Sequence, residues 1–295
     1  MQAIFEKRRF SSHDIWLTAI VVAAVNMLWP SQGKTYSVRE SYTADFLLSN
    51  WLILLSIGCV LYFIHLSSEK QADKHQVGTQ ANSPYSVATP QDWALLVSVF
   101  LLSAWPIRHT STLALSVISF YLLYLLFYRD KQNKTRDYEL LAAASILFAI
   151  SFSRLWSPVL LKVFAVYFEI FDVFLLGKLL NTPTNGNAIQ FVFEPEKRAV
   201  VVMGCTSFAN LSAVVLLWLV VTRWLRTVPR FQIELKALAY LLLTAIAINT
   251  TRIALMVTTK DMYDLWHGPM GSSVTTLLLT MSALLFAMWG AKRAN

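Results

Sequence analysis

The sequence predicts an all-α polytopic membrane protein with about eight transmembrane helices, one amphipathic helix and a short extracytoplasmic β-hairpin. Hydrophobic residues make up 56% of the 295 positions and charged residues only 14%, whereas soluble domains average about 45–50% and about 25%. Stretches of roughly 20 apolar residues recur, and each is long enough to cross a hydrocarbon core of about 30 Å. Ten Trp and eleven Tyr fit anchoring at the two membrane interfaces.

Eight apolar stretches have the length and composition expected of membrane spans. They lie near residues 15–30, 46–66, 93–107, 111–128, 139–157, 202–222, 237–257 and 271–290. We treat residues 1–295 as a single integral membrane domain. Residues 67–92 are polar and contain Pro and Ser, which predicts a flexible cytoplasmic loop.

A ninth apolar segment, residues 158–180, differs because it also contains four charged residues. A charge in the middle of the bilayer costs at least about 2.5–3.5 kcal/mol. Lys162, Glu169 and Asp172 are spaced by seven and three residues, so on one helix they share a face. Two interpretations stay open: a helix at the membrane interface, or a helix buried against the bundle.

The distribution of Lys and Arg predicts the orientation of the chain. If residues 158–180 do not cross the membrane, the side that carries both termini has 15 Lys and Arg and the opposite side has 9. Positively charged loops are retained in the cytoplasm. The sequence therefore predicts eight spans with both termini cytoplasmic.

Residues 185–202 have the pattern of a β-hairpin that leads directly to Cys205. Two β-prone runs flank the turn sequence Glu-Pro-Glu-Lys, and Asn185-Gly186 precedes the first run. By the charge distribution, this hairpin lies on the outer side.

Cys205, Arg252 and His267 are predicted to reach the same membrane face from three separate segments. Cys205 lies at the expected outer start of the sixth span. Asn249 and Arg252 lie in the outer half of the seventh span, and His267 lies in the loop before the last span. The two neutral alternatives are a packing role for the thiol and a surface position for the imidazole.

These three residue types suit acyl transfer. A thiolate is the nucleophilic form of cysteine, and a nearby cation or helix N-terminus lowers the thiol pKa from about 8.5. His267 is positioned by this topology to transfer a proton, which is typically worth about 10²–10⁴-fold in rate. Arg252 suits stabilisation of the thiolate or of a tetrahedral oxyanion, and the backbone amides of residues 204–207 are further candidate donors.

The sequence gives no indication of cofactor or metal chemistry. It contains no Walker loop and no dinucleotide glycine fingerprint, and its five histidines are scattered rather than set at ligand spacing. We therefore expect no cofactor, no metal and no nucleic-acid partner. Only two cysteines are present, too few for a disulfide framework, and Cys59 is expected to be a small buried hydrophobe.

Three motifs in order, "VVMGCTSFANLS", "NTTR" and "HGPMG", resemble those of the exosortase/archaeosortase family of multi-spanning cysteine transpeptidases. The upstream segment "LLGKLLNTPTNGNAIQF" is also similar to the segment before that family's cysteine. The resemblance covers about residues 155–275, which we take as the catalytic region. The family commonly has Ser then Gly after the cysteine, whereas this chain has Thr206 and Ser207.

The resemblance implies a bacterial inner-membrane enzyme whose active site faces the periplasm. Its expected substrates are secreted proteins that end in a short motif, a hydrophobic span and a basic tail. The expected acceptor of the new C-terminus is a lipid or another amine or hydroxyl compound. By the matching positions, Cys205 is the nucleophile, Arg252 the electrostatic partner and His267 the acid/base. The matching supporting positions are Asn249, Ser207 and Gly271.

Two acidic pairs are secondary candidates. Glu169 and Asp172 are three residues apart and suit a substrate contact, in particular with an acceptor amine. The neutral alternative is solvation or a pair with Lys162. Asp261 and Asp264 precede His267 and suit orientation of its imidazole, or form an ordinary exposed acidic loop.

The alternative class is a non-enzymatic transporter or an assembly factor for polysaccharide export. A transporter of this kind often contains inverted repeats, and the sequence shows no internal repeat.

Overall fold

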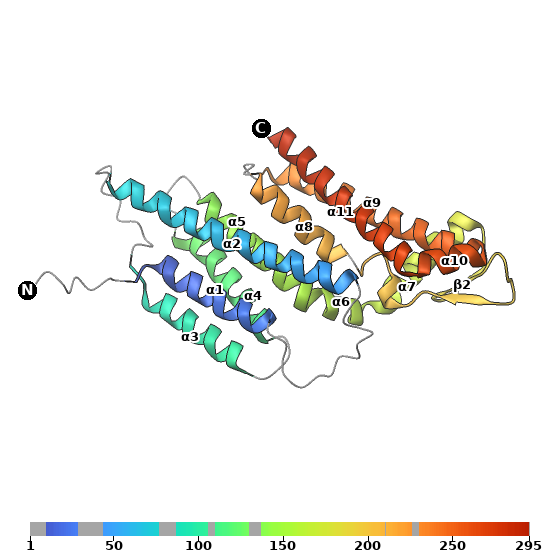
Figure 1. Cartoon of the computed structure of the whole chain (residues 1–295), viewed down its shortest axis with the longest axis horizontal. Coiled ribbons are helices and arrows are strands. Elements are labelled where there is room, and N and C mark those ends of the chain that lie inside the picture. Colours follow the sequence, from blue (N-terminus) through green and yellow to red (C-terminus); the bar gives the residue numbers. More distant parts are fainter. Residues whose placement is uncertain are drawn as a thin grey trace, which may run out of the picture. The chain divides into compact units, whose positions relative to one another are not determined.

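The computed structural model describes residues 10–28, 44–76, 87–105, 110–129, 137–209, 211–225 and 230–294. Most of these residues are helical (Figure 1). The chain divides into two compact units. The first unit contains Met1–Ser37 and Asn50–Leu155, and the second contains Val38–Ser49 and Trp156–Asn295.

The first unit is a helical bundle. It contains α1 (Ser12–Leu28), most of α2 (Ala44–Gln76), α3 (Pro90–Ala104), α4 (Thr110–Tyr124) and α5 (Tyr138–Ser151). The π-helical segments η1 (Leu125–Arg129) and η3 (Phe152–Trp156) continue α4 and α5. Helix α4 packs against α1, α3 and α5. The core of the first unit is formed by fully buried apolar side chains, among them Trp16, Phe63, Leu115 and Ile146.

A buried carboxylate joins three helices of this bundle. Asp92, in the first turn of α3, accepts hydrogen bonds from Ser12 Oγ, Trp16 Nε1 and Tyr121 Oη, each 2.8 Å long. It also caps its own helix by accepting from Thr89 N at 2.8 Å and Thr89 Oγ1 at 2.7 Å. A buried charge is tolerated when hydrogen bonds replace its hydration, and five donors do so here.

Helix α2 extends further than the sequence predicts. The sequence predicts a flexible loop for residues 67–76, but they form the last turns of α2. Ser67 Oγ donates to Asp137 Oδ2 at 2.5 Å, and Lys70 forms an ion pair with Glu139. The polar end of α2 therefore contacts the start of α5, where Asp137 is the N-cap and Glu139 lies in the first turn. Residues 90–92 similarly begin α3, and residues 77–86 lie outside the described residues.

The second unit is built on two long helices, α9 (Phe231–Thr258) and α11 (Pro269–Ala294). They lie side by side, and α8 (Leu211–Trp224) packs against α11 (Figure 1). The contact between α9 and α11 is rich in small buried residues, including Ala237, Ala245, Ala283 and Ala287. Small side chains let two helix backbones approach closely. The short helix α10 (Lys260–His267) joins α9 to α11 and packs on both.

A three-stranded antiparallel sheet precedes α8. Its strands are β1 (Thr184–Asn185), β2 (Ala188–Gln190) and β3 (Arg198–Val200), in the order β1-β2-β3. Gly186, between β1 and β2, has φ +60°, a conformation that glycine adopts readily. The sequence predicts two strands in this region, and the structure adds β1 as a third. Val192 N donates to Val257 O at 2.9 Å, which fixes the sheet to the end of α9.

The segment 158–180 is two helices rather than one. Helix α6 (Ser157–Val163) ends at Phe164, where φ −106° and ψ 14° break the helix, and α7 (Ala165–Leu180) follows. Residues up to Val163 belong to the apolar stretch Tyr138–Val163. Lys162 is therefore not on the helix that carries Glu169 and Asp172, and the shared face expected for the three residues does not exist.

Five helical stretches in the described residues are long and apolar enough to cross a membrane. They are Trp51–Lys70, Thr110–Tyr128, Tyr138–Val163, Phe231–Thr258 and Pro269–Arg293. Three shorter apolar helices, Ser12–Met27, Pro90–Ala104 and Leu211–Trp224, overlap the other expected spans but are only 10–17 residues long, short of the roughly 20 residues of a typical span. The described residues are thus consistent with an all-α membrane protein.

Candidate functional site

Cys205 lies in a tight turn before α8, and not at the start of that helix as the apolar run predicts. Val202 is extended, with φ −99° and ψ 159°, and the 3₁₀ turn η4 (Met203–Cys205) follows it. The Cys205 N–H donates to Val202 O at 2.8 Å. Helix α8 begins at Leu211. The effect of a helix dipole is confined to its first turn, so the α8 dipole does not act on this thiol.

A buried carboxylate of α7 fixes the residues after the cysteine. Ser207 N donates to Asp172 Oδ2 at 2.7 Å, and Asp172 is 0% exposed. The second oxygen, Oδ1, has no hydrogen-bond partner among the described residues. Burial raises the pKa of Asp172, and the hydrogen bonds from Ser207 oppose this rise. Asp172 is therefore buried under the cysteine turn, where it does not present an exposed face to an acceptor amine.

Three of the four amides that the sequence suggests as oxyanion donors are already engaged. Cys205 N–H binds Val202 O, Thr206 N–H binds Met203 O at 3.3 Å, and Ser207 N–H binds Asp172. Among the described residues, the Gly204 N–H has no bonded acceptor, so of the four it alone stays available to an oxyanion.

Asn249 of α9 binds the cysteine turn at two points. Its Nδ2 donates to Cys205 O at 2.9 Å and to Ser207 Oγ at 3.3 Å. Asn249 and Ser207 are both buried. The Ser207 hydroxyl accepts a bond that a glycine has no side chain to accept, so the departure from the family's usual letters has a local structural role.

Arg252 follows Asn249 by three residues on α9, nearly one helical turn, and contacts the segment that carries His267. Its Nε donates to Trp266 O at 3.1 Å, directly before His267. Within the described residues the two terminal nitrogens of this guanidinium make no hydrogen bond or ion pair. The planar fork of Arg252, which suits carboxylate-like oxygens, is therefore available as a donor.

His267 is the last residue of α10 and is exposed. Its ring stacks on Tyr263, with centroids 5.1 Å apart and an angle of 12° between the planes. Tyr263 in turn meets Phe191 edge to face at 5.8 Å. The part of the chain that the structure describes has no hydrogen bond from His267 to Asp261 or Asp264, so aromatic stacking, and not a carboxylate, orients this ring.

Gly271 is required by close packing at the junction of α10 and α11. A Cβ on Gly271 would lie 2.4 Å from Trp266 Cα and 2.5 Å from Trp266 O, which is far inside van der Waals contact. The Trp266 carbonyl is thus held between Arg252 Nε, which donates to it, and Gly271, which packs closely against it. Sequence reasoning did not identify Trp266, because its contribution is a main-chain carbonyl that no residue type indicates.

The structure joins the predicted residues into two groups that meet on α9. Asn249 binds the turn that contains Cys205 and Ser207. Arg252 binds Trp266 O, in the segment that carries His267, and the main chain of Trp266 packs closely on Gly271. The half-buried Cys205 packs against a buried apolar cluster of α7, the sheet region and α9, whose members include Val173, Val201 and Ile253. Within the described residues its thiol makes no hydrogen bond to Arg252 or His267. Glu169 accepts from Asn187 Nδ2 at 3.0 Å, and in the described part of the chain it makes no hydrogen bond or ion pair with a residue of either group.

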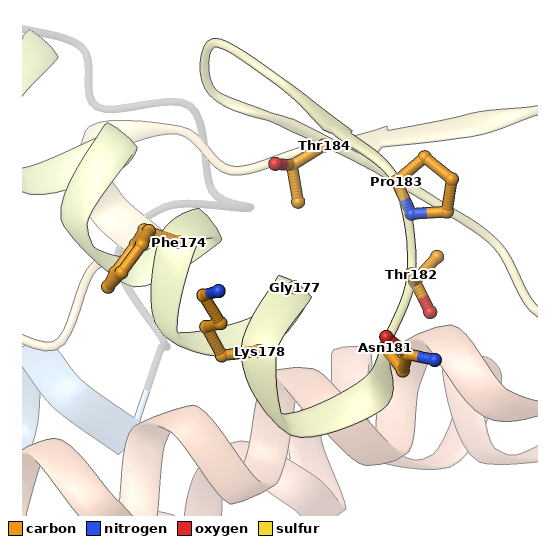
Figure 2. A pocket seen from close by; sticks show the side chains of 7 residues that line it. All are labelled: Phe174, Gly177, Lys178, Asn181, Thr182, Pro183 and Thr184. Atoms are coloured by element: carbon orange, nitrogen blue, oxygen red, sulfur yellow. The ribbon is translucent and has the colours of Figure 1, made fainter.

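A cavity of about 410 Å³ lies at the C-terminal end of α7 (Figure 2). Phe174, Gly177 and Lys178 line it from the helix, and residues 181–184 line it from the link to β1 and the first residue of that strand. It contains none of Cys205, Arg252 and His267, so we do not assign the reaction to it.

No group of three or more His, Cys, Asp or Glu side chains in the described residues could bind a metal ion. Comparison with known proteins finds no match to this chain among family models, curated proteins or solved structures.

Proposed function

We propose that this chain is a membrane-embedded cysteine protease or transpeptidase of the exosortase/archaeosortase type. It cleaves a C-terminal hydrophobic sorting signal of secreted proteins and transfers the new C-terminus from a thioester on Cys205 to an acceptor. One observation carries the proposal. A single stretch of α9 binds the Cys205 carbonyl through Asn249 and the carbonyl before His267 through Arg252.

In the proposed mechanism, the Cys205 thiolate attacks the scissile peptide carbonyl and forms a tetrahedral intermediate. The free fork of Arg252 donates to its oxyanion, a role typically worth about 10²–10³-fold per donor. Protonated His267 gives its proton to the leaving amine as the C–N bond breaks, which leaves a thioester on Cys205. Neutral His267 then takes a proton from the acceptor amine or hydroxyl, or from water, which attacks the thioester and releases Cys205.

The absence of a direct bond from the thiol to His267 does not conflict with these roles. Catalytic hydrogen bonds are often long in substrate-free enzymes and tighten in the complex. The substrate chain itself lies between nucleophile and acid in this mechanism.

We further propose a bacterial inner-membrane location with eight spans, cytoplasmic termini and the site on the outer side. The charge distribution supports this orientation. Irregular backbone is tolerated at membrane depth only where protein buries it or where it lines a water-filled cavity. The turn before α8 meets this condition, because its polar groups bind Asp172 and Asn249.

The first test replaces each cysteine separately. A secreted reporter that ends in an apolar span and a basic tail is expressed with the wild-type chain, Cys205→Ser or Cys59→Ser, and its C-terminus is determined by mass spectrometry. Cys205→Ser is expected to leave the reporter uncleaved, whereas Cys59→Ser, which changes a buried packing residue, is expected to process it. Processing that does not depend on Cys205 would refute the enzyme and favour the transporter or assembly-factor class.

A further inference from the structure

The outer edge of the sheet has main-chain groups with no partner strand. β3 is the last strand in the order β1-β2-β3. Val201 N donates to Asn187 O and Phe191 N donates to Lys197 O, and Ala199 pairs with Ile189 in the same register. The odd-numbered residues of this segment therefore bond to β2, because main-chain bonding alternates along an antiparallel strand. The main-chain groups of Arg198 and Val200 consequently point away from the sheet.

This edge is also apolar and accessible. Val200 is 57% exposed and Val202 is 52% exposed. In the described part of the chain, no hydrogen bond reaches the outward groups of Arg198 and Val200 or the amide of Val202. Proteins usually protect such an edge with charges, Pro or a covering segment. On this edge only the charge of Arg198 gives such protection, and the edge from Val200 to Val202 has none.

The open edge ends at the proposed nucleophile. Val202 continues the extended conformation of β3, and η4 then folds the chain back so that Cys205 N–H binds Val202 O at 2.8 Å. From Arg198 to Val202 the chain is extended for five residues, about 13 Å at the usual rise per residue. A strand paired with this edge would therefore have one end beside Cys205.

We propose that the β3 edge binds an extended segment of the substrate peptide as an additional strand and so brings its scissile carbonyl to Cys205. This inference rests on the proposed function and names how that site recognises its substrate. Unpaired donors and acceptors that recur every second residue match the main chain of an extended peptide, as in other cases of strand addition. A lipid headgroup or a single anion does not offer that repeat.

A cross-linking scan tests this geometry directly. Val200→Cys is introduced into a full-length chain that also carries Cys59→Ser and Cys205→Ala, which leaves one thiol and no nucleophile. The probe is the reporter described above, with a single cysteine at each of eight successive positions before its apolar span. Disulfide formation in native membranes is then measured under mild oxidation. Strand pairing predicts a yield that alternates with a period of two residues, because strand side chains alternate between faces.

Absence of cross-links, a uniform yield or a period of three to four residues would each overturn the inference. The scan requires no catalysis, so its outcome is separate from that of the proposed function. A period of two without Cys205-dependent processing would establish the docking edge and refute the transpeptidase.

A second test removes one outward donor. Val200→Pro deletes the outward N–H without changing the bonds to β2, and Pro is tolerated at such edge positions. Val200→Thr is the matched control, because it retains the N–H. Loss of one docking hydrogen bond is expected to lower kcat/KM for the reporter about tenfold relative to Val200→Thr. Equal kcat/KM for the two variants, with Cys205 still essential, would overturn strand docking and leave the proposed enzyme intact.

Discussion

At the residue scale, the buried carboxylate of Asp172 determines where the cysteine turn lies. Its Oδ2 is the acceptor of the Ser207 N–H, and no other acceptor for that amide is present among the described residues. Asp172→Ala leaves this amide buried and unpaired, at a cost of about 1–3 kcal/mol. Asp172→Asn retains an amide oxygen at the same position and is expected to keep most of the function.

Two readouts test the role of Asp172. We expect Asp172→Ala to lower reporter processing and to change the rate at which iodoacetamide alkylates Cys205, measured with Cys59→Ser throughout. Asp172→Asn is expected to restore both rates towards wild type. If Ala and Asn behave alike, the Ser207 hydrogen bond does not position the thiol.

The proposed role of Arg252 depends on the planar shape of its guanidinium group and not only on its positive charge. Its Nε binds Trp266 O while its terminal nitrogens stay free, and a lysine ammonium offers no planar fork that can do both. Arg252→Lys is therefore expected to lower kcat on the reporter by about 10²-fold or more. An Arg252→Lys enzyme with wild-type kcat would show that only a positive charge is needed at this position.

The sequence indicates candidate residues for the site, but it does not indicate their contacts. Cys205, Arg252 and His267 stand out by type and order, and the chain topology relates them. The partners that position them are main-chain groups, namely Trp266 O and Ser207 N, and side-chain patterns do not encode these. Asp172 is visible as a charge in an apolar segment, but only the fold shows that its partner lies 35 residues away.

At the scale of elements, apolar runs predict which segments are helical but not where the helices begin and end. The run from residue 202 is predominantly apolar, yet α8 begins only at Leu211, after a turn that Asp172 and Asn249 bind. The end of α2 is polar but helical, because Lys70 pairs with Glu139. In both cases a contact distant in sequence overrides the local pattern.

The junction of α10 and α11 gives the prediction at this scale. Gly271→Ala places a methyl group 2.4 Å from Trp266 Cα, so the segment with His267 must shift. We expect reporter processing to fall at least about tenfold, since small displacements of catalytic groups can cost up to about 10²-fold, while the alkylation rate of Cys205 stays near wild type.

The matched control lies in the same helix. In Gly290→Ala the new Cβ would lie 3.8 Å from Ala237 Cβ, an ordinary contact, and Ala has the higher helix propensity. Gly290→Ala is expected to process the reporter normally. Equal loss in both variants would indicate a general effect of alanine in α11 and would remove the special role of Gly271.

At the scale of the whole molecule, the two units differ in how they use their polar residues. In the first unit, Asp92 and the Ser67–Asp137 pair bind groups from neighbouring helices and are satisfied within the bundle. In the second unit, the Arg252 fork, the His267 ring and the β3 edge have polar groups that the described residues do not saturate. These are the groups that the proposed reaction uses, and α9 connects the Cys205 turn to the segment before His267.

The orientation of the chain gives the last prediction. Helix α11 begins two residues after His267, and its stretch Pro269–Arg293 is long enough to cross a membrane, so the sheet region and the C-terminus should lie on opposite sides. Single cysteines are placed at the exposed positions Glu196 and Lys292, with Cys59 and Cys205 both changed to Ser. A membrane-impermeant maleimide is expected to label Glu196→Cys in cells whose outer membrane alone is permeable, and Lys292→Cys only after lysis. Labelling of Lys292→Cys before lysis, with Glu196→Cys protected, would invert the topology and put the thiol on the cytoplasmic side, where a secreted substrate does not arrive.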